Sequence, residues 1–398
     1  MPTGKIKIAP SVLTWARTSL HLTEDDVVVH FAKKSKESFN VDLNFLKNIE
    51  SNECAIKFNL LQELANLYKR PLSIFLLEAP PKELVLPKDR RTIGSLEHQK
   101  LSPETILIFR RVLYTKEIFE DLASDYNYDL KFPYKQVFLD NNPKIIAENF
   151  REELGFSFEF QKDKIKNPKD LFDIIRRKLE EVNAFVIKAS FPIEDARAFS
   201  LVEKSLNIIV INSKDGGYFG YAPKAFSLLH EFAHILLREG GICNDFLNSH
   251  IKIEKFCNEF AASFLVPDRI LLNVLSDNNL ELNDKNIEKS IEILSRIFKV
   301  SKQVLLRKCL SNGLINEGFY KNKIAEWYEN FEKSEKNKSK FVPLSTPGLR
   351  AIKNNSNRYV DIVLQAKSQG KITSNNASDY LGVGVKWLSE VEWRVQKS

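Results

Sequence analysis

Apolar residues recur at spacings of three and four in four short segments between residues 11 and 77. These segments read SVLTWARTSL, TEDDVVVHFAKK, VDLNFLKNI and NLLQELANLYKR. Such spacing places the apolar side chains on one face of a helix, and Thr23 followed by Asp26 resembles the capped start of the second helix. The pattern predicts a compact all-helical domain over residues 1–78.

Proline and polar segments divide the rest of the chain. The segment APPKELVLPKDRRT combines prolines with alternating charges, and prolines cannot continue a helix, so we expect a linker at residues 79–102. The polar stretch EKSEKNKSK, at residues 332–340, predicts a second linker. A main domain at 103–331 and a helical C-terminal region at 332–398 follow from these boundaries.

The main domain mixes helices with buried strands. The apolar runs FVIKASF and NIIVIN have the length of buried strands, and the second is rich in β-branched residues. Helical spacing is expected over 103–125, 143–153, 168–182, 223–237, 249–265 and 281–298. A glycine pair at 240 and 241 marks the end of the helix at 223–237. The sequence therefore predicts an α+β, mostly helical fold.

Composition narrows the class of protein. The 398 residues are 43% hydrophobic and 28% charged, which is typical of a folded protein with more than one domain. No export signal and no apolar run of ~20 residues is evident, so we expect no membrane association. The cysteines, which lack CxxC spacing, are Cys54, Cys243, Cys257 and Cys309. A reducing compartment, the cytoplasm, is expected. The net charge of +7 permits contact with nucleic acid without requiring it.

The strongest chemical signal is HEFAH, at His230 to His234, within the apolar segment FSLLHEFAHILL. Two histidines four residues apart project from one helix face and can bind one Zn²⁺. Glu231 then lies beside the water that the zinc would carry, and a carboxylate there can take the proton of that water during attack on a peptide carbonyl. Since the chain has only six histidines, a chance match is rare, and the motif predicts a zinc hydrolase.

Catalytic zinc usually has three protein ligands, and the segment IEKFCNEFAASFLVP supplies candidates for the third. Glu254 is the first candidate. It shares a helix face with Asn258, which can hydrogen-bond a histidine Nδ1 without binding the metal. Glu259 is an alternative ligand, and His250 is a further alternative that can also stabilise an oxyanion.

HEFAHILL followed by IEKFCNEFAASFLVP resembles the ImmA/IrrE metallopeptidases, in which HExxH precedes E-x-x-(A/C)-N-x-F-A-x-x-(F/L)-L-x-P. The matching positions are Glu254, Asn258, Phe260, Ala261, Leu265 and Pro267. The run NIIVIN and the later segments FKVSKQVLLRKCLSNGLI and RYVDIVLQAKSQGKITSNNASDYLGV are also similar to this family, so the likeness covers nearly the whole chain. It implies a zincin-like metallopeptidase fold for residues 103–331.

The N-terminal segments IAPSVLTWAR and LLQELANLYKRPLSIFLLEAPP resemble the XRE-type helix-turn-helix domain that precedes many such peptidases. In that family a Trp-Glu-x-Gly and a proline usually close the recognition helix. Here the corresponding stretch, NIESNECAIKF, has neither, and the candidate recognition helix VDLNFLKNI has a single lysine. Base and phosphate contacts need donor side chains, so duplex DNA and a protein partner both remain open for this domain.

The resemblance implies a regulatory zinc endopeptidase that cleaves a repressor-like protein and so controls transcription in a stress-response or mobile-element system. The alternative is a DNA-binding regulator whose peptidase fold serves only as a sensor or scaffold. The presence of all four residues His230, Glu231, His234 and Glu254 favours the enzyme, because a site that has lost its activity has no chemical need for all four.

Overall fold

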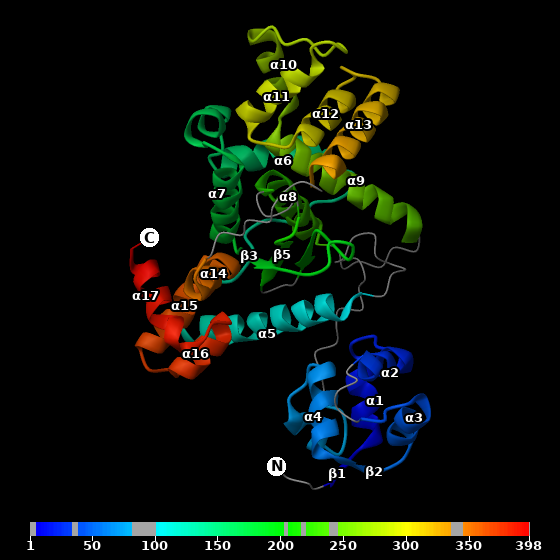
Figure 1. Cartoon of the computed structure of the whole chain (residues 1–398). Coiled ribbons are helices and arrows are strands. Elements are labelled where there is room, and N and C mark those ends of the chain that lie inside the picture. The colour runs from blue at the N-terminus through cyan, green and yellow to red at the C-terminus, as the bar shows by residue number, and fades with distance from the viewer. Residues whose placement is uncertain are drawn as a thin grey trace. The chain divides into compact units, whose positions relative to one another are not determined.

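The computed structural model describes residues 5–33, 39–81, 101–202, 206–215, 220–238, 246–335 and 345–397, without the side chains of 54, 246–250 and 328–335 (Figure 1). Within these residues the fold is mostly helical with two small sheets, so the predicted α+β, mostly helical class is confirmed. Two compact units are present, and the division between them falls after Leu113. No described helix has the length and apolar character needed to cross a bilayer.

The N-terminal unit contains the four helices that the apolar spacing predicts, together with two strands that it does not. Its elements are β1 (Lys5–Ile8), α1 (Pro10–Thr18), α2 (Glu24–Lys33), α3 (Leu43–Ser51), β2 (Cys54–Lys57), α4 (Phe58–Leu67) and the 3₁₀ helix η1 (Leu72–Leu76). The strands pair antiparallel. At the start of α2, Asp26 N–H donates to Thr23 Oγ1 over 3.1 Å, and Thr23 N–H donates to Asp26 Oδ2 over 2.8 Å. This reciprocal cap is the one expected from the sequence.

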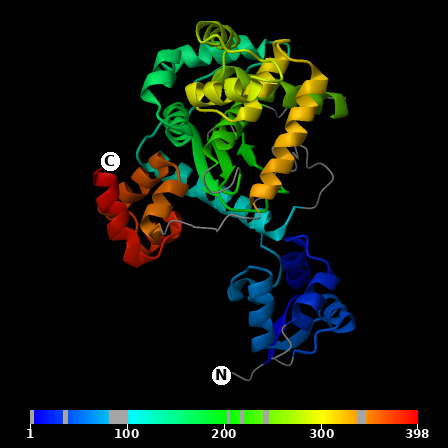
Figure 2. The same ribbon diagram turned by 45° about the horizontal axis from the view of Figure 1, so that its top comes forward.

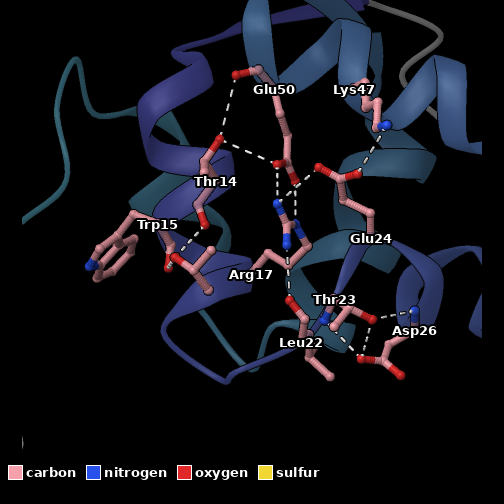
Figure 3. Close-up of polar contacts among 10 residues, drawn as sticks. Thr14, Trp15, Arg17, Leu22, Thr23, Glu24, Asp26, Lys47 and Glu50 are labelled. Atoms are coloured by element: carbon pink, nitrogen blue, oxygen red, sulfur yellow. Dashed lines mark hydrogen bonds and ion pairs between the residues drawn. The ribbon is translucent and has the colours of Figure 1, made fainter.

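A buried ion pair links α1 to α3 in this unit (Figure 3). Arg17 Nε donates to Glu50 Oε1 over 2.8 Å and Arg17 Nη2 donates to Glu50 Oε2 over 2.6 Å. Arg17 Nη1 donates to the carbonyl of Leu22 over 2.9 Å, and Thr14 Oγ1 lies 3.4 Å from Glu50 Oε2. The hydrogen bonds that Arg17 donates to Glu50 outweigh burial and raise the pKa of Arg17. Every nitrogen of the guanidinium therefore has an acceptor.

The sheet of the second unit has three strands in the order β3-β5-β4. The strand β5 (Asn207–Asn212) lies in the centre and is buried along its whole length. It pairs parallel with β3 (Ala184–Ala189) and antiparallel with β4 (Ala198–Leu201). The apolar runs of the sequence coincide with β3 and β5, whereas β4 was not predicted.

Most of the remaining elements are helices. They are α5 (Pro103–Asp125), whose residues up to Leu113 belong to the N-terminal unit, α6 (Pro143–Glu153), the π helix η3 (Phe160–Lys164), α7 (Pro168–Glu181), α8 (Tyr221–Leu237), α9 (Phe246–Leu265), α10 (Asp268–Asp277), α11 (Ile287–Phe298), α12 (Lys302–Ser311) and α13 (Glu317–Glu335). The helix α8 packs against β4, β5, α7 and α9, so it lies near the centre of the unit (Figure 1). Since α8 is apolar on almost every side, it suits this position.

Two sequence predictions differ in detail from these elements. The helix expected at 281–298 begins at Ile287, because the side chain of Asn283 accepts from the backbone N–H of Asn286 and forms a turn before it. The linker expected at 332–340 overlaps the end of α13, which extends to Glu335, and its remainder lies outside the described residues. Most of the linker expected at 79–102 is also outside them.

The C-terminal bundle covers one edge of the sheet (Figure 2). It consists of α14 (Pro347–Asn354), α15 (Asn357–Ser368), α16 (Ser374–Leu381), the 3₁₀ helix η4 (Val385–Trp387) and α17 (Leu388–Gln396). Arg176 on α7 donates through Nη2 to the carbonyl of Val186 on β3 over 3.0 Å and through Nη1 to the carbonyl of Lys353 over 2.9 Å. Glu180 accepts from the N–H of Asn357 over 3.0 Å. These buried groups fasten the bundle to α7 and β3.

Candidate metal centre

The helices α8 and α9 bring two histidines and a glutamate together. His230 Nε2 lies 3.2 Å from His234 Nε2 and 3.4 Å from Glu254 Oε2. His234 Nε2 lies 3.4 Å from Glu254 Oε1. Among the described residues these three form a group whose donor atoms all lie within 4.8 Å of one another. The separation of four residues in α8 and the packing of α9 on α8 produce this convergence.

These donor atoms fit a tetrahedral metal ion. Ligands at about 2.0–2.1 Å from a tetrahedral zinc lie about 3.3–3.4 Å from one another. The observed separations of 3.2, 3.4 and 3.4 Å agree with this value. In addition, Glu254 Oε1 is buried without a hydrogen-bond partner. A cation between the three side chains would satisfy that oxygen, which otherwise costs free energy.

The amide of Asn258 holds His230 from the other side of its ring. Asn258 Oδ1 lies 3.1 Å from His230 Nδ1 and can accept a hydrogen bond only if Nδ1 carries the proton. The neutral imidazole then presents the lone pair of Nε2 toward Glu254 and His234. Asn258 lies four residues after Glu254 on α9, so the same helix face supplies the carboxylate and the amide.

Glu231 is buried next to the cluster, with 6% of its surface exposed. Its Oε2 accepts a hydrogen bond from Ser200 Oγ over 2.8 Å. Ser200 lies on β4, and both residues of the pair are buried. Sequence reasoning missed Ser200; the only signal was a hydroxyl in the otherwise apolar segment AFSLV.

A buried aspartate holds α8 one turn before its first histidine. Asp215 follows β5 and has no exposed surface. Its Oδ2 accepts from Ser227 Oγ over 2.9 Å, and its Oδ1 lies 3.1 Å from Arg197 Nη1. Ser227 is one turn before His230, so this contact sets the position of the helix that carries both histidines. At its other end α8 stops at Leu237, where Arg238 adopts a left-handed conformation with φ 46°.

Aromatic side chains form the core behind the two helices. The ring of Phe232 on α8 lies edge-on to Phe150 of α6 with centroids 5.0 Å apart, and it is 6.3 Å from Phe260 of α9. All three are buried. Such packing locks the rotamers of neighbouring residues and keeps the site in an environment of low polarity.

The alternative ligand Glu259 faces other partners. Its Oε1 accepts from Ser263 Oγ over 3.2 Å and lies 3.4 Å from Lys308 Nζ and 3.6 Å from Lys144 Nζ. It is not part of the group formed by the histidines. The side chain of His250 is outside the described residues, so the second alternative has no structural position.

The electrostatics of Glu254 follow from its two neighbours. Burial raises the pKa of its carboxyl, but hydrogen bonds and positive charge from the two facing imidazoles, when these are protonated, outweigh burial and hold the pKa well below the ordinary value. Glu254 is therefore ionised at neutral pH. An anionic oxygen beside two imidazole nitrogens is a donor set that zinc favours.

The matched sequence family agrees with this geometry. Residues 179–310 match the family model Peptidase_M78, described as the IrrE N-terminal-like domain. The match contains the strands β3 to β5, both helices of the site and the helices up to α12, and residues before 179 are outside it. No curated protein matches the chain. The domain at residues 179–310 supports a place in the ImmA/IrrE family and a metallopeptidase-like role.

Proposed function

We propose that this protein is a zinc-dependent endopeptidase. The observation that carries the proposal is the convergence of His230, His234 and Glu254, whose donor atoms have the spacing of zinc ligands. In this proposal the three side chains hold Zn²⁺. Zinc bound there would lower the pKa of a water molecule to ~7 and polarise a peptide carbonyl.

The remaining residues act on protons and orientation. Glu231 takes the proton of the attacking water and later delivers it to the leaving amine, as a general base and acid. Ser200 fixes the carboxylate of Glu231 through its 2.8 Å hydrogen bond. Asn258 keeps the proton of His230 on Nδ1, so that Nε2 stays available to the metal.

The substrate that we propose is a repressor-like regulatory protein, in line with the likeness to ImmA/IrrE proteins. The N-terminal unit would recognise the partner. The first turn of α2 carries Glu24, Asp25 and Asp26, where a DNA-binding helix would approach phosphate groups, and Lys47 on α3 lies 3.8 Å from Glu24. This charge pattern favours a protein partner over duplex DNA for that unit.

The rival function is a DNA-binding regulator with an inactive peptidase fold. A scaffold gains nothing from a buried carboxylate oxygen without a hydrogen bond, and Glu254 Oε1 is such an atom. A scaffold also has no need for the buried pair of Ser200 and Glu231 beside it. Both observations support the enzyme.

The test is the substitution Glu231→Gln, which keeps the size of the side chain but cannot accept the proton. We expect cleavage to fall by ~10²- to 10⁴-fold, while zinc content stays at the wild-type level. The protein is co-expressed with the product of the neighbouring gene, new termini are sought by mass spectrometry, and zinc is measured by elemental analysis. Glu259→Gln, a matched change on α9, should alter neither quantity. Cleavage by Glu231→Gln at the wild-type rate would refute the proposal.

A further inference from the structure

The last two helices of the C-terminal bundle form a helix-turn-helix. The helix α16 starts with a reciprocal cap between Thr373 and Asn376 and ends at Gly382, whose φ of 65° favours glycine. After it the N–H of Val383 donates to the carbonyl of Ser378 over 3.0 Å, and Ser378 Oγ donates to the carbonyl of Val383. A short turn then enters η4 and α17. Two helices joined by such a glycine turn are the DNA-reading unit of many regulators.

Five apolar side chains of this unit are buried against the bundle. They are Ala377, Leu381, Val383, Leu388 and Val391, which are buried together with Val363 and Ala366 of α15. The inner face of α17 is thereby fixed. Its opposite face lies on the outer side of the bundle, away from the rest of the second unit (Figures 1 and 2).

That outer face is polar, basic and aromatic. Lys386, Ser389, Trp393 and Lys397 are exposed at spacings of three and four, so they line one side of η4 and α17. Trp393 is 52% exposed, and Lys397 Nζ lies 4.4 Å from the centroid of its ring. An exposed aromatic ring between lysines offers contacts to a ligand that has both anionic and flat apolar groups.

The acidic residues of α17 are neutralised by neighbours. Glu390 accepts from Arg394 Nε over 2.7 Å, and Glu392 lies 2.5 Å from Lys367 Nζ. In the described part of the chain no carboxylate pairs with Lys386 or Lys397. The first turn of α16 contains no acidic residue, so its N-terminal N–H groups can approach a phosphate.

We propose that the C-terminal bundle binds duplex DNA, with α17 in the major groove and the beginning of α16 against the sugar-phosphate backbone. Lys386 and Lys397 would neutralise phosphates, Ser389 would hydrogen-bond base edges, and Trp393 would make apolar contact with thymine methyl groups or sugars. Charge complementarity to a polyanion selects this partner over a protein.

Another helix pair of the second unit lacks these properties. The helices α11 and α12 are also joined by a left-handed residue, Lys299, with φ 60°. However, α13 packs against α12, and Lys308 of α12 is fully buried in an ion pair with Asp268. The helix α13 thus covers part of α12, and Lys308 is committed to the ion pair. The turn geometry alone therefore does not carry the proposal; the exposed face of α17 does.

The first test measures binding of the full chain to a 30-base-pair duplex of mixed sequence by fluorescence anisotropy. Non-specific affinities of this kind lie at about 10⁻⁶ to 10⁻⁴ M at physiological salt. The double variant Lys386→Glu/Lys397→Glu should lose at least about 10-fold in affinity, and the slope of log affinity against log salt should fall by about two. A charge-matched control, Lys285→Glu/Lys289→Glu, alters two exposed lysines, one just before α11 and one in its first turn. An equal loss in the control, or no binding by wild type at 100 μM (about the upper limit), would overturn the proposal.

The second test locates the contact, because DNA bound elsewhere on the chain would also shift the anisotropy. A photo-cross-linking residue, p-benzoylphenylalanine, replaces Ser389 on the outer face of α17 or, as a control, Lys289 on α11. An adduct between DNA and position 389 alone is the expected result. Bound DNA without an adduct at 389, or an adduct with a protein in its place, would overturn the proposal. Zinc content and cleavage should be unchanged in both variants, so the outcome is independent of the proposed peptidase.

Discussion

Two buried clusters of charged and polar side chains join pairs of helices in this protein, and they differ in how their atoms are satisfied. In the N-terminal unit, Arg17 and Glu50 meet through two hydrogen bonds of 2.8 and 2.6 Å, and the third guanidinium nitrogen donates to Leu22. In this cluster each nitrogen donor of the guanidinium faces an oxygen acceptor. At the junction of α8 and α9, by contrast, the two Nε2 atoms face each other at 3.2 Å and both face the carboxylate of Glu254.

The difference separates a structural contact from a site. An arginine and a glutamate neutralise each other and need nothing further. Two imidazoles and a carboxylate are all Lewis bases, and Glu254 Oε1 is buried without a hydrogen bond. Such a cluster is complete only with a cation. The interactions of the first cluster are complete in the folded chain, whereas the second cluster can gain further interaction free energy by binding a metal.

The largest effect is expected from breaking the first cluster. Arg17→Met leaves Glu50 buried and unpaired, which typically costs ~3–5 kcal/mol. We expect amide hydrogen exchange in α1 and α3 to accelerate accordingly, while zinc content and exchange in α8 stay unchanged. The double change Arg17→Met/Glu50→Met removes both charges and should recover most of the loss.

The exposed pair Lys7–Glu53 is the control for this prediction. Its atoms are 2.5 Å apart, close to the 2.6 Å of Arg17 and Glu50, but the side chains are 73% and 67% exposed instead of 9% and 6%. Because solvent screens exposed pairs, Lys7→Met should leave the exchange of α1 unchanged. A loss equal to that of Arg17→Met would show that burial does not set the strength of the first cluster.

A smaller effect is expected from removing one base of the second cluster. Glu254→Ala should weaken zinc binding by about 100-fold, since losing even a residue behind a ligand costs ~10- to 100-fold. Zinc affinity is measured by competition with a chelator. Glu259→Ala should keep full affinity, because its partner Lys308 retains Asp268. Unchanged affinity in Glu254→Ala would show that another carboxylate completes the cluster.

The smallest effect concerns the hydroxyl beside the second cluster. Ser200→Ala removes the hydrogen bond to Glu231, and a bond of this kind is worth ~1 kcal/mol, so kcat should fall by roughly 5-fold. KM and zinc content should not change, because Ser200 contacts neither substrate nor metal in the proposed mechanism. Ser200→Thr keeps the hydroxyl and should restore part of the rate. A larger change in KM than in kcat would contradict this role.

The site shows how far sequence reasoning reaches. The helix period alone places His230 and His234 on one face, and it places Glu254 and Asn258 on another. Both pairs are found together in the structure. Local spacing could not show that Ser200, 31 residues before Glu231 in the chain, lies against it. That contact depends on the packing of β4 against α8, which no local pattern encodes.

The fold shows the same limit. Long amphipathic helices such as α7 and α11 have a clear period and were predicted. The strands β1, β2 and β4 have only four residues each and were missed, since two periods of alternation do not rise above chance. Their pairing partners are also distant in sequence, as with Lys5 and Lys57.

One contact of Arg176 can form only late in the synthesis of this protein. Its acceptor at Lys353 is 177 residues further along the chain. At a translation rate of ~5–20 residues per second, about 9 to 35 s pass before that carbonyl exists. During this interval Arg176 lacks an acceptor that it has in the finished fold, and the edge of β3 is not yet covered by α14. Ribosomes that stop early would release chains with an open strand edge, a surface prone to aggregation.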